Sequence, residues 1–430
     1  MKGGITGSTS GGRLVQRHLT DSPYLKIFTS RKMMTIVLMG FGSGLPLPLV
    51  LGTLQAWLTT SGIDIRTIGV FSLVRFPYLL KFVWSPLMDR FVPPWLGRRR
   101  GWILPVQFLL IISISAMALA SPAKMPLALA VIAIVVAFVS ASQDIVVDAY
   151  RTDIVDDNER KPGAAVSIFG YRIAMLVSGP LAFIAADRMG WQNTYFCMAI
   201  FMIVGISGTL LGREPDAQVS PPKTLEQAVY KPLKDFFTRK HALVLILFII
   251  LYKLGDAYAT ALSTAFLLRG LHFTLTEVGT LYKAIGIIAT IVGALFGGAL
   301  MVRLGLYRSL MFFGILQMVS NLSFMVLAWT GKNYSVMITA VLFENVAGGM
   351  GSAAFVAFVM ALCNRSYSAT QYALLSSFAA WGVFAISPSA GFVVQAVGWP
   401  IFFLITTLAA LPGLVILRLL REDIRAIREV

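Results

Sequence analysis

The chain has 430 residues, of which 57% are hydrophobic and only 13% charged, and its formal net charge is +16. Soluble domains contain about 25% charged residues, so this composition excludes an ordinary water-soluble protein. Apolar stretches of about 18 residues or more recur from end to end, and each is long enough to cross a bilayer as a helix. Because every backbone amide in lipid must find a partner within its own segment, the sequence predicts an all-α polytopic membrane protein.

The apolar stretches predict about twelve membrane spans in two six-helix bundles. Residues 1–32 form a tail that lacks the apolar core of a cleavable signal peptide. The N-terminal bundle, 33–211, has spans at 33–57, 68–88, 102–121, 125–149, 163–186 and 193–211. A polar linker, 212–241, follows it. The C-terminal bundle, 242–418, has spans at 242–268, 277–300, 309–329, 334–361, 370–396 and 400–418, before a tail of residues 419–430.

Lysine and arginine predict the orientation of these spans. If the N-terminus is inside, the cytoplasmic segments hold 26 of these residues and the opposite loops hold 5. This bias satisfies the positive-inside rule with both termini in the cytoplasm. The net positive charge is therefore a topology signal, and we expect no nucleic-acid partner.

Similar strings follow the second and the eighth spans. Ser85-Pro-Leu-Met-Asp-Arg is similar to Gly298-Ala-Leu-Met-Val-Arg, as two parallel halves require. With Arg98-Arg99-Arg100, the first string resembles the signature of the loop between spans two and three in major facilitator transporters, although Ser85 replaces a glycine and the spacing is longer. The resemblance implies that Asp89, Arg90 and Arg98 form a latch between the bundles. The alternative is that the arginines only set the topology.

Longer strings resemble the AmpG muropeptide permease family. They are SGLPLPLVLGTLQAWL (43–58), TIGVFSLVRFPYLLKFVWSPLMDR (67–90), GRRRGW (97–102) and SQDIVVDAYRTDIV (142–155). The resemblance implies import of N-acetylglucosaminyl-1,6-anhydro-N-acetylmuramyl peptides across the inner membrane of Gram-negative bacteria for cell-wall recycling. Several members have two further C-terminal spans, so we expect those spans to be dispensable or the substrate range to be modified. The related acetyl-coenzyme A transporters suggest the alternative substrates, acetyl-coenzyme A-like or drug-like anions.

Ionisable residues inside spans are functional candidates because each costs ~2.5–3.5 kcal/mol on insertion scales. They are Arg75, Lys81, Asp144, Asp148, Arg172, Lys253, Asp256, Lys283 and Glu344. Five bases and four acids are nearly balanced, which suggests that many of them pair inside the bundle.

Four of these acids are candidates for proton coupling: Asp144, Asp148, Asp256 and Glu344. Asp144 and Asp148 share one helix face, and two close, desolvated carboxylates favour protonation of one of them. Alternatively, Asp148 pairs with Arg151. Asp256 is expected to pair with Lys253, and Glu344 is either a second proton site or the partner of Lys283.

The candidate substrate-binding residues are polar or basic side chains of the spans. Arg75 and Tyr78, three residues apart, and Lys81 suit an acylated sugar that bears carboxylates, because guanidinium grips a carboxylate with two hydrogen bonds. Alternatively, either base only neutralises Asp144. Tyr171 and Arg172 precede Gly179-Pro180, which is similar to the bend of span five in the superfamily. The full set is Gln55, Arg75, Tyr78, Lys81, Gln143, Tyr171, Arg172 and Asn345.

Other chemistry has little support in the sequence. His18, His241 and His272 lie outside the span centres, so we expect neither a metal site nor a histidine relay. The sequence has no phosphate-binding loop for ATP, and we expect no cofactor. A membrane-bound transferase, the rival class, would gather its polar residues at one membrane face. Here they are spread over six spans, as a central cavity predicts, which favours a secondary transporter. We expect a monomer whose partners are the bilayer, protons and an anhydromuropeptide.

Overall fold

A computed structural model describes residues 30–155, 160–215, 234, 236–238, 241–363 and 368–426. Within these ranges every regular element is a helix. In this part of the chain, ten helical stretches are long and apolar enough to cross a membrane. Two of them, Val166–Leu211 and Leu374–Leu419, have 46 residues each, a length of ~69 Å at ~1.5 Å per residue and about twice a bilayer core.

Both long stretches are broken near their middle by a glycine. Gly190 has φ 79° and Gly398 has φ 76°, values in which an L-residue with a side chain is strained. Each stretch therefore crosses twice, and the ten stretches make twelve spans. This confirms the predicted number of spans, and the predicted boundary regions at 187–192 and 397–399 contain both glycines. Most of the predicted linker, 212–241, lies outside the described residues.

The N-terminal bundle contains six spans. Their helices are α3 (Arg31–Gly44), α4 (Pro46–Val50) and α5 (Gly52–Thr60); α6 (Ile65–Val70), the 3₁₀ segment η1 (Phe71–Arg75) and α7 (Phe76–Arg90); α8 (Arg100–Leu119); α9 (Pro126–Ile154); and α10 (Arg160–Leu176), the π segment η3 (Val177–Leu181) and α11 (Ala182–Leu211), the last of which Gly190 divides.

The C-terminal bundle repeats this plan. Its helices are α13 (Ala242–Tyr252), α14 (Leu254–Thr260), α15 (Ser263–Ala265) and the π segment η5 (Phe266–Gly270); α16 (Leu275–Glu277), the π segment η6 (Val278–Ala284) and α17 (Ile285–Leu304); α18 (Leu306–Thr330); α19 (Tyr334–Ala361); α20 (Ser368–Ile386), the 3₁₀ segment η8 (Ser387–Ser389) and α21 (Ala390–Ala409), which Gly398 divides; and α22 (Leu411–Leu419), followed by α23 (Arg421–Ala426).

The irregular turns within spans have identifiable causes. Pro180 lies inside η3, where a proline removes one helical hydrogen bond and pushes the preceding turn apart. This is the bend that Gly179-Pro180 predicts. Pro46 begins α4, and Leu51, with φ −116° and ψ −97°, ends it. The first span is therefore three short helices rather than one.

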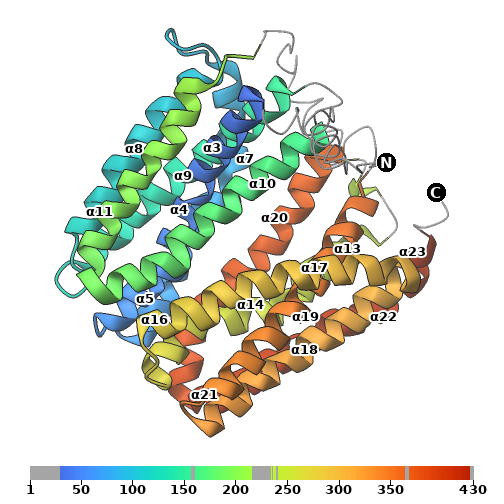
Figure 1. Ribbon diagram of the computed structural model, residues 1–430. Helices are drawn as coiled ribbons and strands as arrows, with labels where there is room; N and C mark the ends of the chain where they lie inside the picture. Colours follow the sequence, from blue (N-terminus) through green and yellow to red (C-terminus); the bar gives the residue numbers. More distant parts are fainter. Residues whose placement is uncertain are drawn as a thin grey trace, which may run out of the picture.

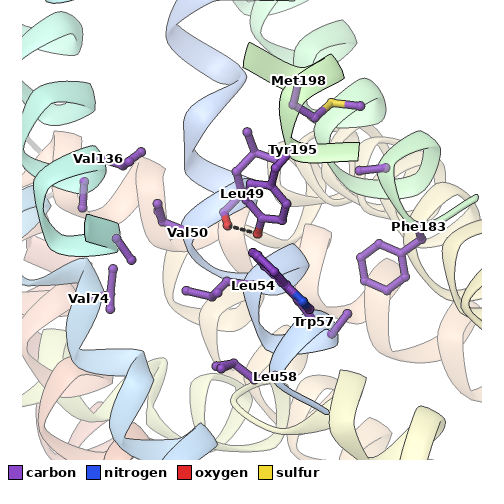
Figure 2. Packing of buried hydrophobic residues seen from close by; sticks show 14 of the residues in the cluster. Leu49, Val50, Leu54, Trp57, Leu58, Val74, Val136, Phe183, Tyr195 and Met198 are labelled. Atoms are coloured by element: carbon purple, nitrogen blue, oxygen red, sulfur yellow. Dashed lines mark hydrogen bonds between the residues drawn. The ribbon is translucent and has the colours of Figure 1, made fainter. Parts of the chain in front are cut away.

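An aromatic cluster fills the core of the N-terminal bundle around this break (Figure 2). The carbonyl of Leu49 is in the last turn of α4, where carbonyls have no partner in their own helix. The hydroxyl of Tyr195, which is fully buried, donates to this carbonyl at 2.7 Å. The Tyr195 ring packs on Trp57 with centroids 4.9 Å apart. Burial of these rings ties α11 to the broken first span.

The two bundles meet at one end of the molecule, which carries residues 61–64, 271–274 and 331–333 and is called the closed end here. Figure 1 shows α5, α16 and α21 grouped at this end, while the bundles diverge toward the other end. Polar contacts cross the interface: Arg269 donates to the carbonyl of Thr59 at 2.9 Å, and the Thr276 hydroxyl donates to Asp187 at 2.6 Å.

Glycine allows the closest approach of the bundles at the closed end. A Cβ on Gly391 of α21 would overlap the backbone carbonyl of Ile65, which begins α6. Overpacking of this kind costs ~1–3 kcal/mol. The strain exists only while the closed end is closed, so Gly391→Ala should shift the population toward closed-end opening by about 5- to 150-fold.

Spin labels at Lys124 and Lys332 can measure this shift, because these residues lie in closed-end loops of different bundles. In a background with Cys197 and Cys363 replaced by serine, opening would appear as a longer distance between the two labels. Gly298→Ala is the matched control, because a Cβ there meets nothing within 4 Å. Identical distance distributions in wild type and Gly391→Ala would contradict the prediction.

Candidate functional site

A cavity of about 120 Å³ lies between the two bundles. The N-terminal bundle contributes Gln55 of α5 and Arg75 of η1, and the C-terminal bundle contributes Thr260 of α14 and Lys283 of η6. η1 is a 3₁₀ segment and η6 a π segment. Such departures from α-helical geometry re-aim side chains and are frequent at functional sites. The central cavity is therefore lined by side chains of both bundles.

Arg75 and Lys283 give this central cavity its charge. The guanidinium Nε of Arg75 is buried without a hydrogen-bond partner. The Lys283 ammonium lies 4.6 Å from the centroid of the Tyr282 ring and 5.9 Å from that of Phe183. Among the described residues, neither cation has a carboxylate within 4 Å. Since an unpaired charge in a desolvated site is unfavourable, the pair favours an anion in the cavity.

Gln55, a predicted substrate ligand, has a second role in this arrangement. Its side-chain amide donates to the backbone carbonyl of Ala261 at 2.5 Å, across the bundle interface. Ala261 begins the break between α14 and α15, which leaves its carbonyl available. Gln55 thus lines the central cavity and links the bundles at the same time.

The predicted acids of the C-terminal bundle, Glu344 and Asp256, do not line the central cavity. Glu344 of α19 is only 5% exposed, and its carboxylate accepts from the amide of Asn345 at 2.9 Å. Asn345 also accepts from the hydroxyl of Thr290 at 3.1 Å, between α17 and α19. Lys283 attracts Glu344 electrostatically, with no ion pair between them within the described structure. Glu344 is therefore not neutralised by direct contact with a base.

The predicted pairing of Lys253 with Asp256 is confirmed. The Lys253 ammonium lies 3.9 Å from the Asp256 carboxylate and donates to the hydroxyl of Ser352 at 2.9 Å. These contacts join the seventh span to the tenth. A proton-carrying role for Asp256 would have to operate within this ion pair.

A second pocket, of about 470 Å³, lies within the N-terminal bundle. Its lining includes four of the predicted site residues, Asp144, Asp148, Tyr171 and Arg172. The Ser43 hydroxyl of α3 donates to the Asp144 carboxylate. Lys81 attracts Asp144, but among described side chains no base lies within 4 Å of it. Asp144 is thus held by a neutral donor, which suits a carboxyl group that gains and loses a proton.

Asp148 differs from Asp144 in its partner and exposure. Arg151 lies 3.2 Å from its carboxylate, and the Asp148 side chain is 59% exposed. The same arginine donates to the hydroxyl of Ser167 at 3.2 Å. The ion pair with Arg151, which the sequence gives as the alternative for Asp148, is therefore present. Because Asp148 is largely exposed, Asp144 and Asp148 are not a pair of desolvated carboxylates.

Three further predicted ligands lie outside the central cavity. Gln143 is fully buried inside the N-terminal bundle, near Gly42, and both of its amide atoms lack a partner among the described residues. It lines neither pocket, because its side of α9 faces the bundle core. The hydroxyl of Tyr78 is also buried, beside Ser140 of α9. Arg172 is exposed and contacts the sulfur of Met175 at 3.7 Å.

The predicted latch is described only in part. The side chains of Asp89 and Arg90 lie outside the described part of the chain, and Arg98 is half-buried. The arginines beside them do more than set topology: Arg99 forms an ion pair with Asp153 at 2.7 Å, with side chains 6% and 15% exposed. The Glu214 carboxylate accepts from the backbone of Arg99 at 2.6 Å and of Arg100 at 3.0 Å, where α8 begins. Sequence reasoning missed these contacts, since Asp153 and Glu214 are far away along the chain.

Comparison with known proteins identifies the family. The Major Facilitator Superfamily model matches residues 32–387. The anhydromuropeptide permease of Escherichia coli K12 is 52% identical over 409 residues, which cover 95% of this chain and 83% of that protein. Putative transporter AmpG 4 of Rickettsia felis is 36% identical, over 93% of this chain and 99% of that protein.

Solved structures share the fold at low identity. The nucleoside transporter NupG has a TM-score of 0.70 and 14% identity, covering 90% of this chain and 99% of that one. A bacterial homologue of the lysosomal transporter Spinster has a TM-score of 0.67 and 15% identity, covering 92% and 97%. The two relatives from Escherichia coli and Rickettsia felis are a permease and a transporter by name. The chain belongs to the Major Facilitator Superfamily and, within it, to the AmpG-type muropeptide permeases.

Proposed function

We propose that this protein imports anhydromuropeptides across the bacterial inner membrane in symport with protons. The observation that carries the proposal is the 52% identity to the Escherichia coli anhydromuropeptide permease over 95% of the chain. The central cavity supports it, because Arg75 and Lys283 suit the carboxylates of a peptide stem. The cavity lies between two bundles of a single chain, so one copy is the proposed transport unit.

The cavity size indicates which part of the substrate it receives. About 120 Å³ accommodates a carboxylate-bearing terminal group but not a disaccharide peptide. Arg75 and Lys283 would then bind the peptide end, from opposite bundles. The sugars would lie toward the diverging end, where the 470 Å³ pocket presents Tyr171 and Arg172. Rocking of the bundles about this central site is the general mechanism of such folds.

Proton coupling follows from the charge of the substrate. An anhydromuramyl tripeptide that ends in diaminopimelate carries about −2, and moving each charge against an inside-negative potential costs ~2.3 kcal/mol per 100 mV. At about 150 mV the import of the anion alone is opposed by ~7 kcal/mol, and two protons remove this barrier. Asp144 and Glu344 are the proposed carriers, since Asp148 and Asp256 are engaged by Arg151 and Lys253.

We place both termini and the 212–241 linker in the cytoplasm, on the basis of the 26-to-5 distribution of Lys and Arg. Alkaline phosphatase is active only outside the cytoplasm. A fusion after residue 240 should therefore be inactive and one at residue 332 active, each measured at matched expression. The reverse pattern would refute this orientation.

Uptake into proteoliposomes tests the function itself. Purified protein should accumulate radiolabelled N-acetylglucosaminyl-anhydro-N-acetylmuramyl tripeptide when the outside is made acidic. Unlabelled anhydromuropeptide should compete, and acetyl-coenzyme A, the alternative anion, should not. Uptake of acetyl-coenzyme A without uptake of anhydromuropeptide would overturn the proposal.

A further inference from the structure

We propose that the C-terminal bundle binds an anionic phospholipid in a groove lined by five arginines. The groove lies where α17 ends, α18 begins and α22 leads into α23, at the end opposite the closed end (Figure 1). It is called the arginine groove here. Its arginines are Arg303, Arg308, Arg418, Arg421 and Arg425. The proposal concerns a lipid site outside the transport pathway and is independent of the proposed substrate.

The polar half of the arginine groove is a pocket of about 460 Å³ that contains Arg303, Arg308 and Arg425. The Arg425 guanidinium lies 5.6 Å from the centroid of the Tyr307 ring, a geometry in which the aromatic face orients the cation. Within the described chain, none of these three arginines has a carboxylate within 4 Å. The acids of α23 do not line the pocket, and Asp423 contacts His241 at 3.0 Å. Among the described residues, the pocket therefore carries positive charge that no carboxylate pairs with.

The beginning of α18 adds to this charge. Gly305, with φ 77°, is the single residue between α17 and α18, and no side chain caps the helix. The first backbone N–H groups of a helix have no partner within it and carry a partial positive charge. Here the residues that bear them, Leu306, Tyr307 and Arg308, line the pocket. Unpaired backbone donors and arginine side chains together suit a phosphate group.

The apolar half of the groove distinguishes a lipid from a free phosphate. A second pocket of about 460 Å³ shares Tyr307 with the first and is lined by Met311, Leu411, Leu414 and Val415. Leu411 is 41% exposed and Val415 58% exposed, on helices that span the membrane. Arg418 and Arg421 also line this second pocket. A phosphate in the first pocket would thus be continuous with an acyl chain along α18 and α22, which is the chemistry of a phospholipid.

Bound lipid would join α23 to the bundle. Ile424 of α23 is 1% exposed and packs in the same hydrophobic cluster as Leu310 and Leu417, while Arg425 and Arg308 reach the groove from α23 and α18. A headgroup between these two arginines would connect the two helices. We therefore expect both selective retention of anionic lipid and a higher melting temperature when it is bound.

Native mass spectrometry of the full-length protein tests the site. Purified protein is titrated with phosphatidylglycerol or phosphatidylcholine of the same acyl chains, and bound lipid is counted. Wild type should retain phosphatidylglycerol selectively. Since one basic residue near an anionic lipid contributes about 5-fold in affinity, Arg308→Gln/Arg425→Gln should bind it about 25-fold more weakly. Arg308→Lys/Arg425→Lys keeps the charge and should retain most of the binding.

Two controls decide between this site and general surface charge. Arg213→Gln/Lys234→Gln removes the same charge from exposed positions outside the arginine groove and should leave lipid binding unchanged. All variants should have wild-type helical content by circular dichroism, because the substituted side chains are exposed. Equal retention of both lipids by wild type, or equal loss in the control variant, would overturn the proposal. Equal thermal stabilisation by inorganic phosphate alone would also overturn it, since that outcome requires no acyl chain.

Discussion

Asp144→Asn should abolish uptake driven by a pH gradient while substrate counterflow partly survives. The substitution removes the proton-binding group but keeps the size of the side chain, and the Ser43 hydroxyl can still donate to the remaining carbonyl oxygen. Counterflow needs the bundles to alternate with substrate bound, not a net proton flux. Initial rates of labelled anhydromuropeptide uptake and exchange in the same proteoliposomes separate these two processes.

Asp148→Asn is the matched control for this experiment. It removes an acid one helical turn away, which is largely exposed and already paired with Arg151, and gradient-driven uptake should be reduced only slightly. Wild-type accumulation by both Asp144→Asn and Glu344→Gln would exclude these acids as proton carriers. Uptake by wild type that a protonophore leaves unchanged would remove proton coupling altogether.

Arg75→Gln should weaken binding of the anhydromuropeptide by at least about 30-fold. Truncating one partner of a desolvated charge pair typically costs ~2–5 kcal/mol, which corresponds to about 30- to 4000-fold in Kd. Lys283→Gln should have an effect in the same direction, because it faces the same cavity from the other bundle. Arg75→Lys should recover only part of the affinity, because an ammonium lacks the planar pair of donors of a guanidinium. Isothermal titration calorimetry of the purified variants measures these changes.

A modified substrate makes the test specific. If Arg75 binds a stem carboxylate, a muropeptide with amidated carboxylates should bind wild type and Arg75→Gln with similar affinity, as in a double-mutant cycle. Arg188→Gln, at an exposed position of the closed end, controls for the loss of one positive charge. An equal loss of affinity for the amidated and the free substrate would show that Arg75 supports the fold of the cavity rather than the carboxylate.

The spans were predictable because each must satisfy its own backbone and offer an apolar surface to lipid, which leaves a signal in local composition. The break at Gly190 falls where the sequence turns polar, next to Asp187 and Arg188. The break at Gly398 lies in an apolar string and is marked instead by the glycine itself and by Pro400. Ion pairs three residues apart, such as Lys253 with Asp256, were predictable for the same local reason. Helix spacing fixes which side chains share one face.

The site was only partly predictable because it depends on how separate spans pack. Lys283 faces Arg75 from the other bundle, 208 positions along the chain, and the sequence offers Glu344 as an equally reasonable partner. Gln143 is the opposite case: its position beside Asp144 suggests the cavity, but consecutive residues of a helix point in directions about 100° apart. Arg99 and Asp153 meet only because α8 and α9 are neighbours.

Helices with irregular turns and continuous helices occupy different places in this molecule. The spans that contact the opposite bundle are the interrupted ones, with η1, η3, η5, η6 and η8 or the break at Leu51 within them. By contrast, α8, α9, α18 and α19 run without interruption and pack mainly against helices of their own bundle. Bending therefore requires little energy in the spans at the interface between the bundles and much more in these continuous helices. Substrate binding between the bundles would therefore rotate two nearly rigid halves relative to each other rather than distort either bundle.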